Sequence, residues 1–106
     1  MEQHILKWNG EDKMDNGKFV ELCKEKVVDY NNTHMNLNSF NKPAHISTSD
    51  VYVVWLNRTL QNNKALLSTT FTDGMYYEVT YNGDKNELYF DAYKRVENVE
   101  FKLGDN

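Results

Sequence analysis

Six side chains in the last third of the chain could carry acid–base chemistry. Three are phenols and three are carboxylates: Tyr76, Glu78, Glu87, Tyr89, Asp91 and Tyr93. Within 76–78 and 87–93 they alternate with other residues, so two strands of a hairpin would place all six on one face. A carboxylate beside a phenol could act as a general acid or base. Such a face more often only contacts solvent, so a small enzyme with a Tyr/Asp/Glu pocket ranks third, and no catalytic residue is assigned.

A binding function accounts better for the same face. Rigid aromatic rings surrounded by charged side chains are typical of the centres of protein interfaces. The sequence therefore predicts a non-enzymatic protein that binds another protein. The residues predicted to form its interface are Tyr52, Tyr76, Tyr89, Asp91 and Tyr93.

Stacking of single-stranded nucleic acid on the tyrosines is the second interpretation. A stacking platform needs basic flanks that follow the phosphate backbone. Lys85, Lys94 and Arg95 lie nearby in the sequence, yet Glu87 and Asp91 offset their charge. With a net charge of −4 and a pI near 5.3, the chain as a whole does not attract phosphate or anionic lipid. We expect no binding to duplex DNA and no membrane association.

The spacing of histidines, cysteine and glycines does not favour metal, thiol or phosphate chemistry. His4, His34 and His45 form neither an HxH nor an HExxH pattern, so we predict no metal site. The sequence contains no glycine-rich phosphate loop, and we predict no cofactor. Cys23 falls on an apolar helical stripe, which favours a buried hydrophobic role over a reactive thiol.

Length and composition are typical of one globular domain. The chain has 106 residues, of which 40% are hydrophobic and 26% charged. The single cysteine cannot form an intramolecular disulfide, and neither a signal-peptide pattern nor an apolar stretch of about 18 residues occurs. We therefore expect a cytoplasmic protein.

Residues 50–93 organise the predicted fold. Four runs rich in strand-forming residues follow one another: VYVVWLNRTL, ALLSTTF, MYYEVTY and ELYFDAY. Asn62-Asn63, Asp73-Gly74 and Asn82-Gly83 fall between them, and these residue types favour turns. The pattern predicts an antiparallel β-meander. In its first run both parities are apolar, which predicts a strand that is central in the sheet or covered on both sides.

One helix is predicted before the meander. Phe19, Leu22, Cys23, Val27 and Tyr30 recur at helical spacing, which predicts a helix over about 17–31 that ends at Asn31-Asn32. Residues 1–16 form an arm of uncertain structure, a short added strand or a loose segment, and residues 17–106 form a single α+β domain. Residues 32–49 form a long loop that contains the only proline.

The predicted fold is α+β, with one N-terminal helix packed on a four- to five-stranded antiparallel β-meander. The helical stripe should contact odd-numbered positions of the sheet: Val53, Trp55, Tyr77 and Val79. A four-residue loop, 82–85, is predicted in the last hairpin because a two-residue loop would place Glu78 opposite Glu87. That loop pairs Val79 with Leu88 and Tyr77 with Phe90. Alternation over 99–103 predicts a fifth strand or a bent continuation of the fourth.

Two alternatives stay open for the tyrosine-bearing face. It could be exposed, as a docking surface or a homodimer seam. It could instead be covered by the long loop or by the N-terminal arm, where Trp8, Phe40 and Ile46 are available.

Several phrases in the second half resemble a family of small uncharacterised proteins, a domain of unknown function, found in Firmicutes and their bacteriophages. They are VYVVW, RTLQNNKALLST, DGMYYE and TYNGDK. The resemblance covers about Phe19 to Val99, with Arg58 where a lysine is expected, and it does not include the first 16 residues. It implies a phage or prophage setting and brings no catalytic residues. It also suggests an accessory protein that binds a host or phage protein, as an inhibitor of a host factor or of a defence system.

Overall fold

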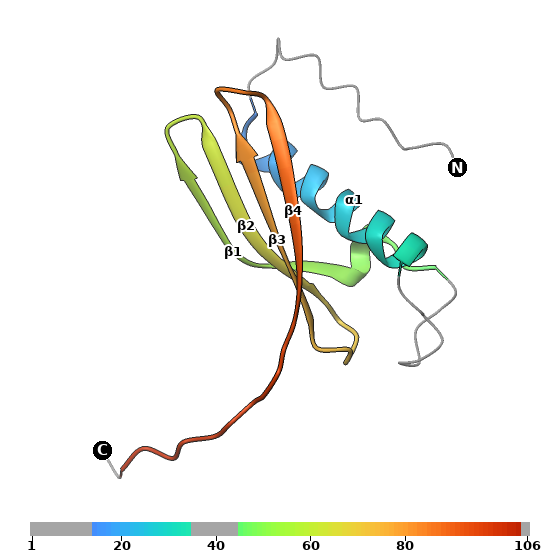
Figure 1. Cartoon of the computed structure of the whole chain (residues 1–106), viewed down its shortest axis with the longest axis vertical. Helices are drawn as coiled ribbons and strands as arrows, with labels where there is room; N and C mark the ends of the chain where they lie inside the picture. Colours follow the sequence, from blue (N-terminus) through green and yellow to red (C-terminus); the bar gives the residue numbers. More distant parts are fainter. Residues whose placement is uncertain (1–13, 35–44, 105–106) are drawn as a thin grey trace.

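A computed structural model of the chain describes residues 14–34 and 45–104. One helix lies against one face of a four-stranded antiparallel sheet, as Figure 1 shows, and this confirms the predicted α+β class. The elements are α1 (Asn16–His34), the short 3-10 helix η2 (Thr48–Asp50), β1 (Val51–Thr59), β2 (Asn62–Thr69), β3 (Met75–Asn82) and β4 (Glu87–Lys94). The predictions for the arm, including Trp8, and for Phe40 lie outside the described residues.

Helix α1 begins where Asp15 can cap it. The backbone N–H of Lys18 donates to Asp15 Oδ1 at 2.8 Å, which satisfies one of the donors that a helix start leaves open. The predicted end at Asn31-Asn32 is wrong, because α1 continues to His34. Asn31 is fully buried and its amide donates to Val27 O at 2.8 Å and to Tyr77 Oη at 3.1 Å. Its side chain is therefore bonded inside the fold and does not end the helix.

The strands follow one another in the order β1-β2-β3-β4, so the predicted meander is correct. The first turn is not at Asn62-Asn63 as predicted, because Leu60 and Gln61 connect β1 to β2 and both asparagines belong to β2. Asn63 is buried and donates to Asn16 Oδ1 at 3.3 Å. Leu60 instead adopts the left-handed backbone, with φ of 57°.

The last hairpin has a four-residue loop, but it lies one position later than predicted. Asn82 pairs with Glu87, so residues 83–86 form the loop. Asn82 Oδ1 accepts the backbone N–H groups of Asp84 at 3.1 Å and Lys85 at 3.3 Å, and Asn86 has a φ of 52°. This local turn geometry, rather than avoidance of like charges, sets the register.

The predicted pairs of Val79 with Leu88 and of Tyr77 with Phe90 are therefore wrong. Val79 pairs with Phe90 and Tyr77 with Ala92. Glu78 lies opposite Asp91, which is the kind of like-charge pair that the prediction sought to avoid. Lys64 Nζ lies 3.7 Å from Glu78 Oε2 and offsets that repulsion.

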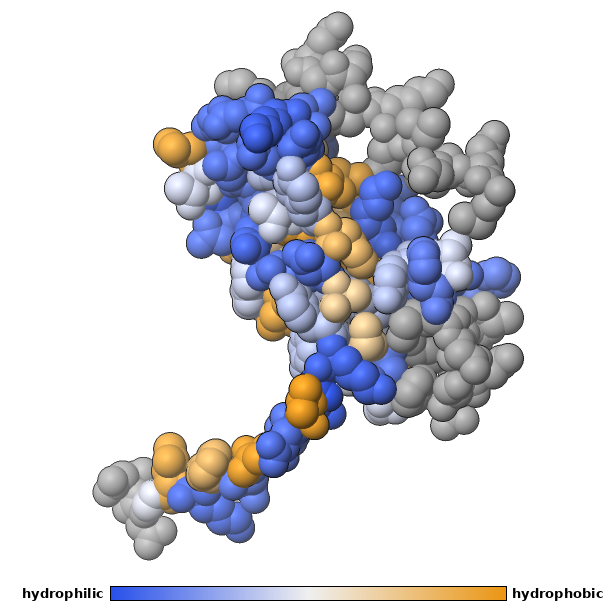
Figure 2. Space-filling model, viewed as in Figure 1, coloured by the Kyte–Doolittle hydropathy of each residue, from blue (hydrophilic) through white to orange (hydrophobic). Residues whose placement is uncertain are grey.

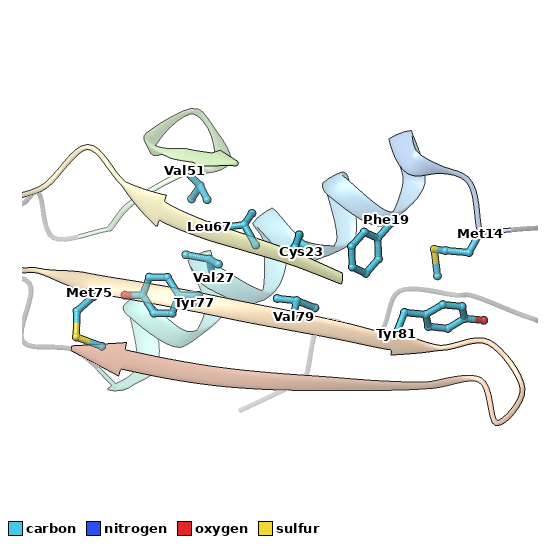
Figure 3. Close-up of a cluster of buried hydrophobic side chains, with 11 residues drawn as sticks. Met14, Phe19, Cys23, Val27, Val51, Leu67, Met75, Tyr77, Val79 and Tyr81 are labelled. Carbon is cyan, nitrogen blue, oxygen red and sulfur yellow. The ribbon is translucent and has the colours of Figure 1, made fainter. Parts of the chain in front are cut away.

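The hydrophobic core lies between α1 and the sheet. Figure 3 shows Phe19, Cys23 and Val27 directed from α1 toward the strands. They meet side chains that alternate along β2 and β3: Ala65, Leu67, Met75, Tyr77, Val79 and Tyr81. Leu22, Tyr30 and Val53 pack against this cluster while partly exposed. The predicted contact of the helical stripe with Val53, Tyr77 and Val79 is confirmed.

The predicted core position of Trp55 is wrong because β1 contains a bulge. The register between β1 and β2 shifts between Val53 and Trp55, so that Val53 pairs with Leu67 and Trp55 with Leu66. An extra residue reverses the alternation of all residues that follow it. Leu56 packs against the core instead, and Trp55 is 41% exposed. The bulge also explains why this run is apolar at both parities, because the alternation reverses within it. The prediction of a central strand is wrong, because β1 lies at the edge of the sheet.

Residues 95–104, termed the C-terminal segment, contain no strand. The backbone N–H of Arg95 donates to Gly74 O at 2.7 Å, and beyond it the segment extends away from the sheet, as Figure 1 shows. The predicted fifth strand is thus absent from the described sheet. Gly74 precedes the first residue of β3, so beyond Arg95 none of the described strands is available for pairing.

Candidate functional site

The candidate site is the outer face of the sheet, the face opposite α1. The strand register arranges its residues in rows that cross all four strands. The first row is Tyr52, Ser68, Tyr76 and Tyr93; the second is Trp55, Leu66, Glu78 and Asp91; the third is Asn57, Lys64, Thr80 and Tyr89. Since the side chains of one row point to the same side of the sheet, the register brings all five predicted interface residues onto one surface.

Large apolar side chains on this face are accessible to solvent among the described residues. Tyr89 is 51% and Tyr93 52% exposed on β4, while Tyr52 is 45% and Trp55 41% exposed on β1. Tyr76, directly opposite Tyr93, is partly buried. The aromatic surface therefore occupies both edge strands.

Sequence reasoning missed Trp55 and Leu66 as parts of this face. Trp55 was predicted to lie in the core because strict alternation aligned it with Val51 and Val53. A bulge has no reliable signature in a single sequence, and the run VYVVW is apolar at both parities. The outward position of Leu66 could have been predicted, because Leu66 alternates along the strand with Ala65 and Leu67, which are buried.

One predicted cover for this face lies elsewhere. Ile46 is buried, and both of its backbone groups bond to Asn32 of α1: the N–H donates to Asn32 Oδ1 at 3.0 Å, and the carbonyl accepts from Asn32 Nδ2 at 3.3 Å. Ile46 therefore secures the start of the described 45–50 segment to the helix. The other predicted covering residues, Trp8 and Phe40, lie outside the described residues.

The charge of the outer face is predominantly acidic. Glu78, Glu87 and Asp91 share it with one lysine, Lys64. Lys94, which was considered as a basic flank for nucleic acid, pairs with the buried Met75 and therefore lies on the side of α1. The carboxylates thus outnumber the cations on this surface, which disfavours a phosphate backbone.

The carboxylates hold the neighbouring phenols in their protonated form. Tyr89 Oη donates to Glu87 Oε1 at 2.5 Å, and this hydrogen bond and charge raise the pKa of Tyr89. Asp91 first, and Glu78 second, raise the pKa of Tyr93. Both phenols therefore remain hydrogen-bond donors at neutral pH and are poor general bases. The geometry suits recognition better than proton abstraction.

An open hollow lies at the β1 end of the third row, beside Trp55. It has a volume of about 300 Å³ and is lined by Trp55, Asn57, Thr59, Asn62, Asn63, Lys64 and Thr80. Its lining combines an indole, several amides and hydroxyls, and one ammonium group. These are groups that can accept an apolar side chain and bond to the polar atoms around it.

The other reactive side chains do not form a site. Cys23 is fully buried, and burial raises the pKa of its thiol to about 12, which leaves the thiol unreactive. The His34 ring stacks on Tyr30, with 4.9 Å between centroids. Within 14–34 and 45–104, no three His, Cys, Asp or Glu side chains are grouped so that they could hold a metal ion. His4 lies outside these ranges.

The family of unknown function DUF6275 matches residues 20–103, and the chain belongs to this family. The match includes α1 except its first turn, the whole sheet and most of the C-terminal segment. Among curated proteins and among solved structures, none matches the chain. In the part of the chain that the structure describes, no helix has the length and apolar character needed to cross a membrane.

Proposed function

We propose that this member of the DUF6275 family acts by binding another protein through the outer face of its sheet. The observation that supports the proposal is the set of half-exposed aromatic side chains that the two edge strands present on one face: Tyr52 and Trp55 on β1, and Tyr89 and Tyr93 on β4. Contiguous exposed aromatic area is uncommon on a protein that works alone.

The chemistry of the face suits a protein partner. Tyrosine and tryptophan supply large rigid contact areas and retain a polar group for hydrogen bonding. Leu66 and Tyr76 lie between the two aromatic edges and are partly buried, so they offer a preformed centre. A partner that fits has an apolar patch rimmed by lysine or arginine, because Glu78, Glu87 and Asp91 surround the tyrosines.

The setting of the proposal comes from the resemblance to proteins of Firmicutes and their phages. We propose that the chain is a phage or prophage accessory protein in the bacterial cytoplasm. Its partner is then a host or phage protein, and inhibition of a host factor or defence system is the outcome that such binding would serve. This part of the proposal rests on analogy of setting, and the surface chemistry supports only the binding step.

Nucleic acid is a weaker candidate for the same face. The tyrosines could stack bases, but stacking platforms are flanked by basic residues that follow the phosphates. On this face Lys64 lies 3.7 Å from Glu78, and Asp91 follows in the same row as Glu78. A chain of net charge −4 with this arrangement favours a basic partner.

The proposal is tested by capture followed by a binding measurement. Tagged protein is incubated with a lysate of the bacterial host with and without nuclease, the captured proteins are identified, and the one captured most strongly in the presence of nuclease is purified. Its Kd is then measured against wild type, Tyr93→Ala and Trp55→Ala. Residues that anchor an interface lose more than about tenfold in affinity when truncated.

Leu60→Ala is the matched control, because Leu60 is 81% exposed and apolar but lies in the β1–β2 turn. We expect weaker binding for Tyr93→Ala and Trp55→Ala and an unchanged Kd for Leu60→Ala. If every captured partner is lost on nuclease treatment, the face serves nucleic acid. An unchanged Kd for both aromatic variants contradicts the proposal directly.

A further inference from the structure

The C-terminal segment presents apolar side chains that nothing in the described structure covers. Val96 is 99% exposed, Phe101 80% and Leu103 89%, and Val99 is 53% exposed. Figure 2 shows both apolar and hydrophilic surface along the segment that extends away from the rest of the molecule. Val99, Phe101 and Leu103 alternate with Glu100 and Lys102, which is the pattern of a strand with one apolar side.

β4 is the edge of the sheet that can accept another strand. Its eight residues pair with β3 without a register shift, and none of the strands within 14–34 and 45–104 pairs with its outer edge. The opposite edge, β1, has the bulge between Val53 and Trp55, a device that discourages edge-to-edge pairing. β4 and the C-terminal segment are continuous in the chain, so together they form one ribbon over 87–104 with an open edge.

We propose that two copies of the chain pair through this ribbon, with β4 of each copy bound antiparallel to the C-terminal segment of the other. An interface between identical copies is two-fold symmetric, so if residue i contacts residue j, then j contacts i. In an antiparallel pair, hydrogen-bonded and non-hydrogen-bonded positions alternate. Symmetry then requires that residues of the same parity face each other and that one residue lies opposite itself.

Charge selects which residue lies on the two-fold axis. An axis at Arg95 would place two guanidinium groups opposite each other, and an axis at Glu97 would do the same with two carboxylates. An axis at Val96 pairs the two valines and places Arg95 of each copy opposite Glu97 of the other. Opposite charges directly across an antiparallel pair are favourable and like charges are unfavourable. The ribbon is therefore centred on Val96.

The same register places two of the exposed apolar residues, Val99 and Leu103, beside the tyrosines. With Val96 at the centre, Tyr93 lies opposite Val99 of the second copy and Tyr89 opposite Leu103. Both tyrosines are half-exposed on the outer face. A two-fold axis through an antiparallel ribbon is perpendicular to the sheet, so the outer faces of both copies point to the same side. The dimer thus extends the surface of the proposed function, but it does not depend on that function.

Oxidative cross-linking tests the position of the axis. Val96→Cys places two thiols opposite each other at a separation that a disulfide tolerates. Leu103→Cys is the control, because position 103 lies opposite position 89 and the two copies of residue 103 are then about 45 Å apart. Cys23 is buried, so it does not compete for oxidation. We expect a rapid disulfide-linked dimer from Val96→Cys alone.

A charge exchange tests the pairing itself. Sedimentation of purified protein is measured over a range of concentrations for wild type, Arg95→Glu, Glu97→Arg and the double variant. We expect dimers from wild type and the double variant, and at least tenfold weaker association of each single variant. Both side chains, Arg95 and Glu97, lie in an exposed segment, and circular dichroism verifies that the fold is unchanged.

Three outcomes would overturn the proposal. Wild-type protein that sediments as a monomer at every concentration shows that the segment stays free or folds back on its own chain. Equal cross-linking at positions 96 and 103 shows non-specific contact. A dimer that both single charge variants leave intact has another interface. Because these measurements use only purified protein, their failure is distinguishable from failure of partner binding.

Discussion

Tyr77→Phe removes one hydroxyl from the centre of the core and leaves the ring in place. Tyr77 and Asn31 are both fully buried, and Asn31 Nδ2 donates to Tyr77 Oη at 3.1 Å. Loss of a hydrogen bond between neutral groups destabilises a protein by about 0.5–1.5 kcal/mol. We therefore expect the variant to be about 1 kcal/mol less stable than wild type at pH 7.

The difference between the two proteins should depend on pH. Burial raises the pKa of Tyr77 to about 12, against the lowering effect of its hydrogen bond with Asn31. The folded protein therefore keeps the phenol proton over a range in which the unfolded chain, with a pKa near 10, loses it. The contribution of this phenol to the free energy of unfolding is complete below pH 10 and is lost as the pH rises toward 12. At pH 11 the loss is about 1.4 kcal/mol. Tyr77→Phe has no such loss.

Urea unfolding followed by circular dichroism at pH 7 and pH 11 measures this difference. The deficit of Tyr77→Phe should fall from about 1 kcal/mol at pH 7 to about zero, or change sign, at pH 11. All other titrating groups are present in both proteins and cancel. Cys23→Ala provides a comparison, because burial raises the pKa of the Cys23 thiol from 9.0 to about 12. The difference in unfolding free energy between wild type and Cys23→Ala should therefore begin to narrow near pH 9. If the deficit of Tyr77→Phe is equal at both pH values, the argument from burial is refuted.

Three further predictions concern packing, a turn and nucleic acid. Leu67→Ala truncates a fully buried leucine and should destabilise the protein by about 2–5 kcal/mol in urea unfolding, whereas Leu22→Ala truncates a half-buried one and should cost less; the reverse order would contradict the packing. Gly83→Ala should lower the thermal midpoint, because a Cβ there would overlap the backbone of Gln61, and an unchanged midpoint would show that the loop can move. Titration with duplex DNA at physiological salt should show no micromolar binding, since the carboxylates of the outer face outnumber its cations; binding with a steep salt dependence would overturn this.

Periodicity predicted the elements of this fold because the hydrophobic effect acts on whole faces. Phe19, Cys23 and Val27 recur at the spacing of one helix face, and all three are fully buried. The alternation from Met75 to Tyr81 likewise matches the observed burial along β3. Such patterns survive local irregularities because many residues contribute to each one.

Single-residue features escaped prediction because tertiary contacts decide them. Asn31 resembles a helix end in sequence, but in the core its amide bonds to Val27 O and Tyr77 Oη. The loop and register of the last hairpin were predicted from repulsion between carboxylates, and this repulsion is weak at an exposed position. The bonds of Asn82 Oδ1 to two backbone N–H groups have greater influence on the turn. Local turn geometry therefore outranks surface charge when a register is predicted.

The bulge in β1 connects the main error in the fold prediction with the composition of the outer face. Without it, Trp55 would point toward α1, and Tyr52 would be the principal aromatic group on that edge. The extra residue turns Trp55 outward, beside Leu66 in the next strand. It also interrupts the β1 edge, which leaves β4 as the regular one. A variant with Val54 deleted should lose the bulge and keep Trp55 opposite Leu66 on the outer face, because Val53, Trp55 and Leu56 then follow the strict alternation of a regular strand. In a Trp8→Phe background, we expect acrylamide to quench the fluorescence of Trp55 equally in this deletion variant and in Val54→Ala, and strong protection of Trp55 in the deletion variant would contradict the assignment of Val54 as the extra residue.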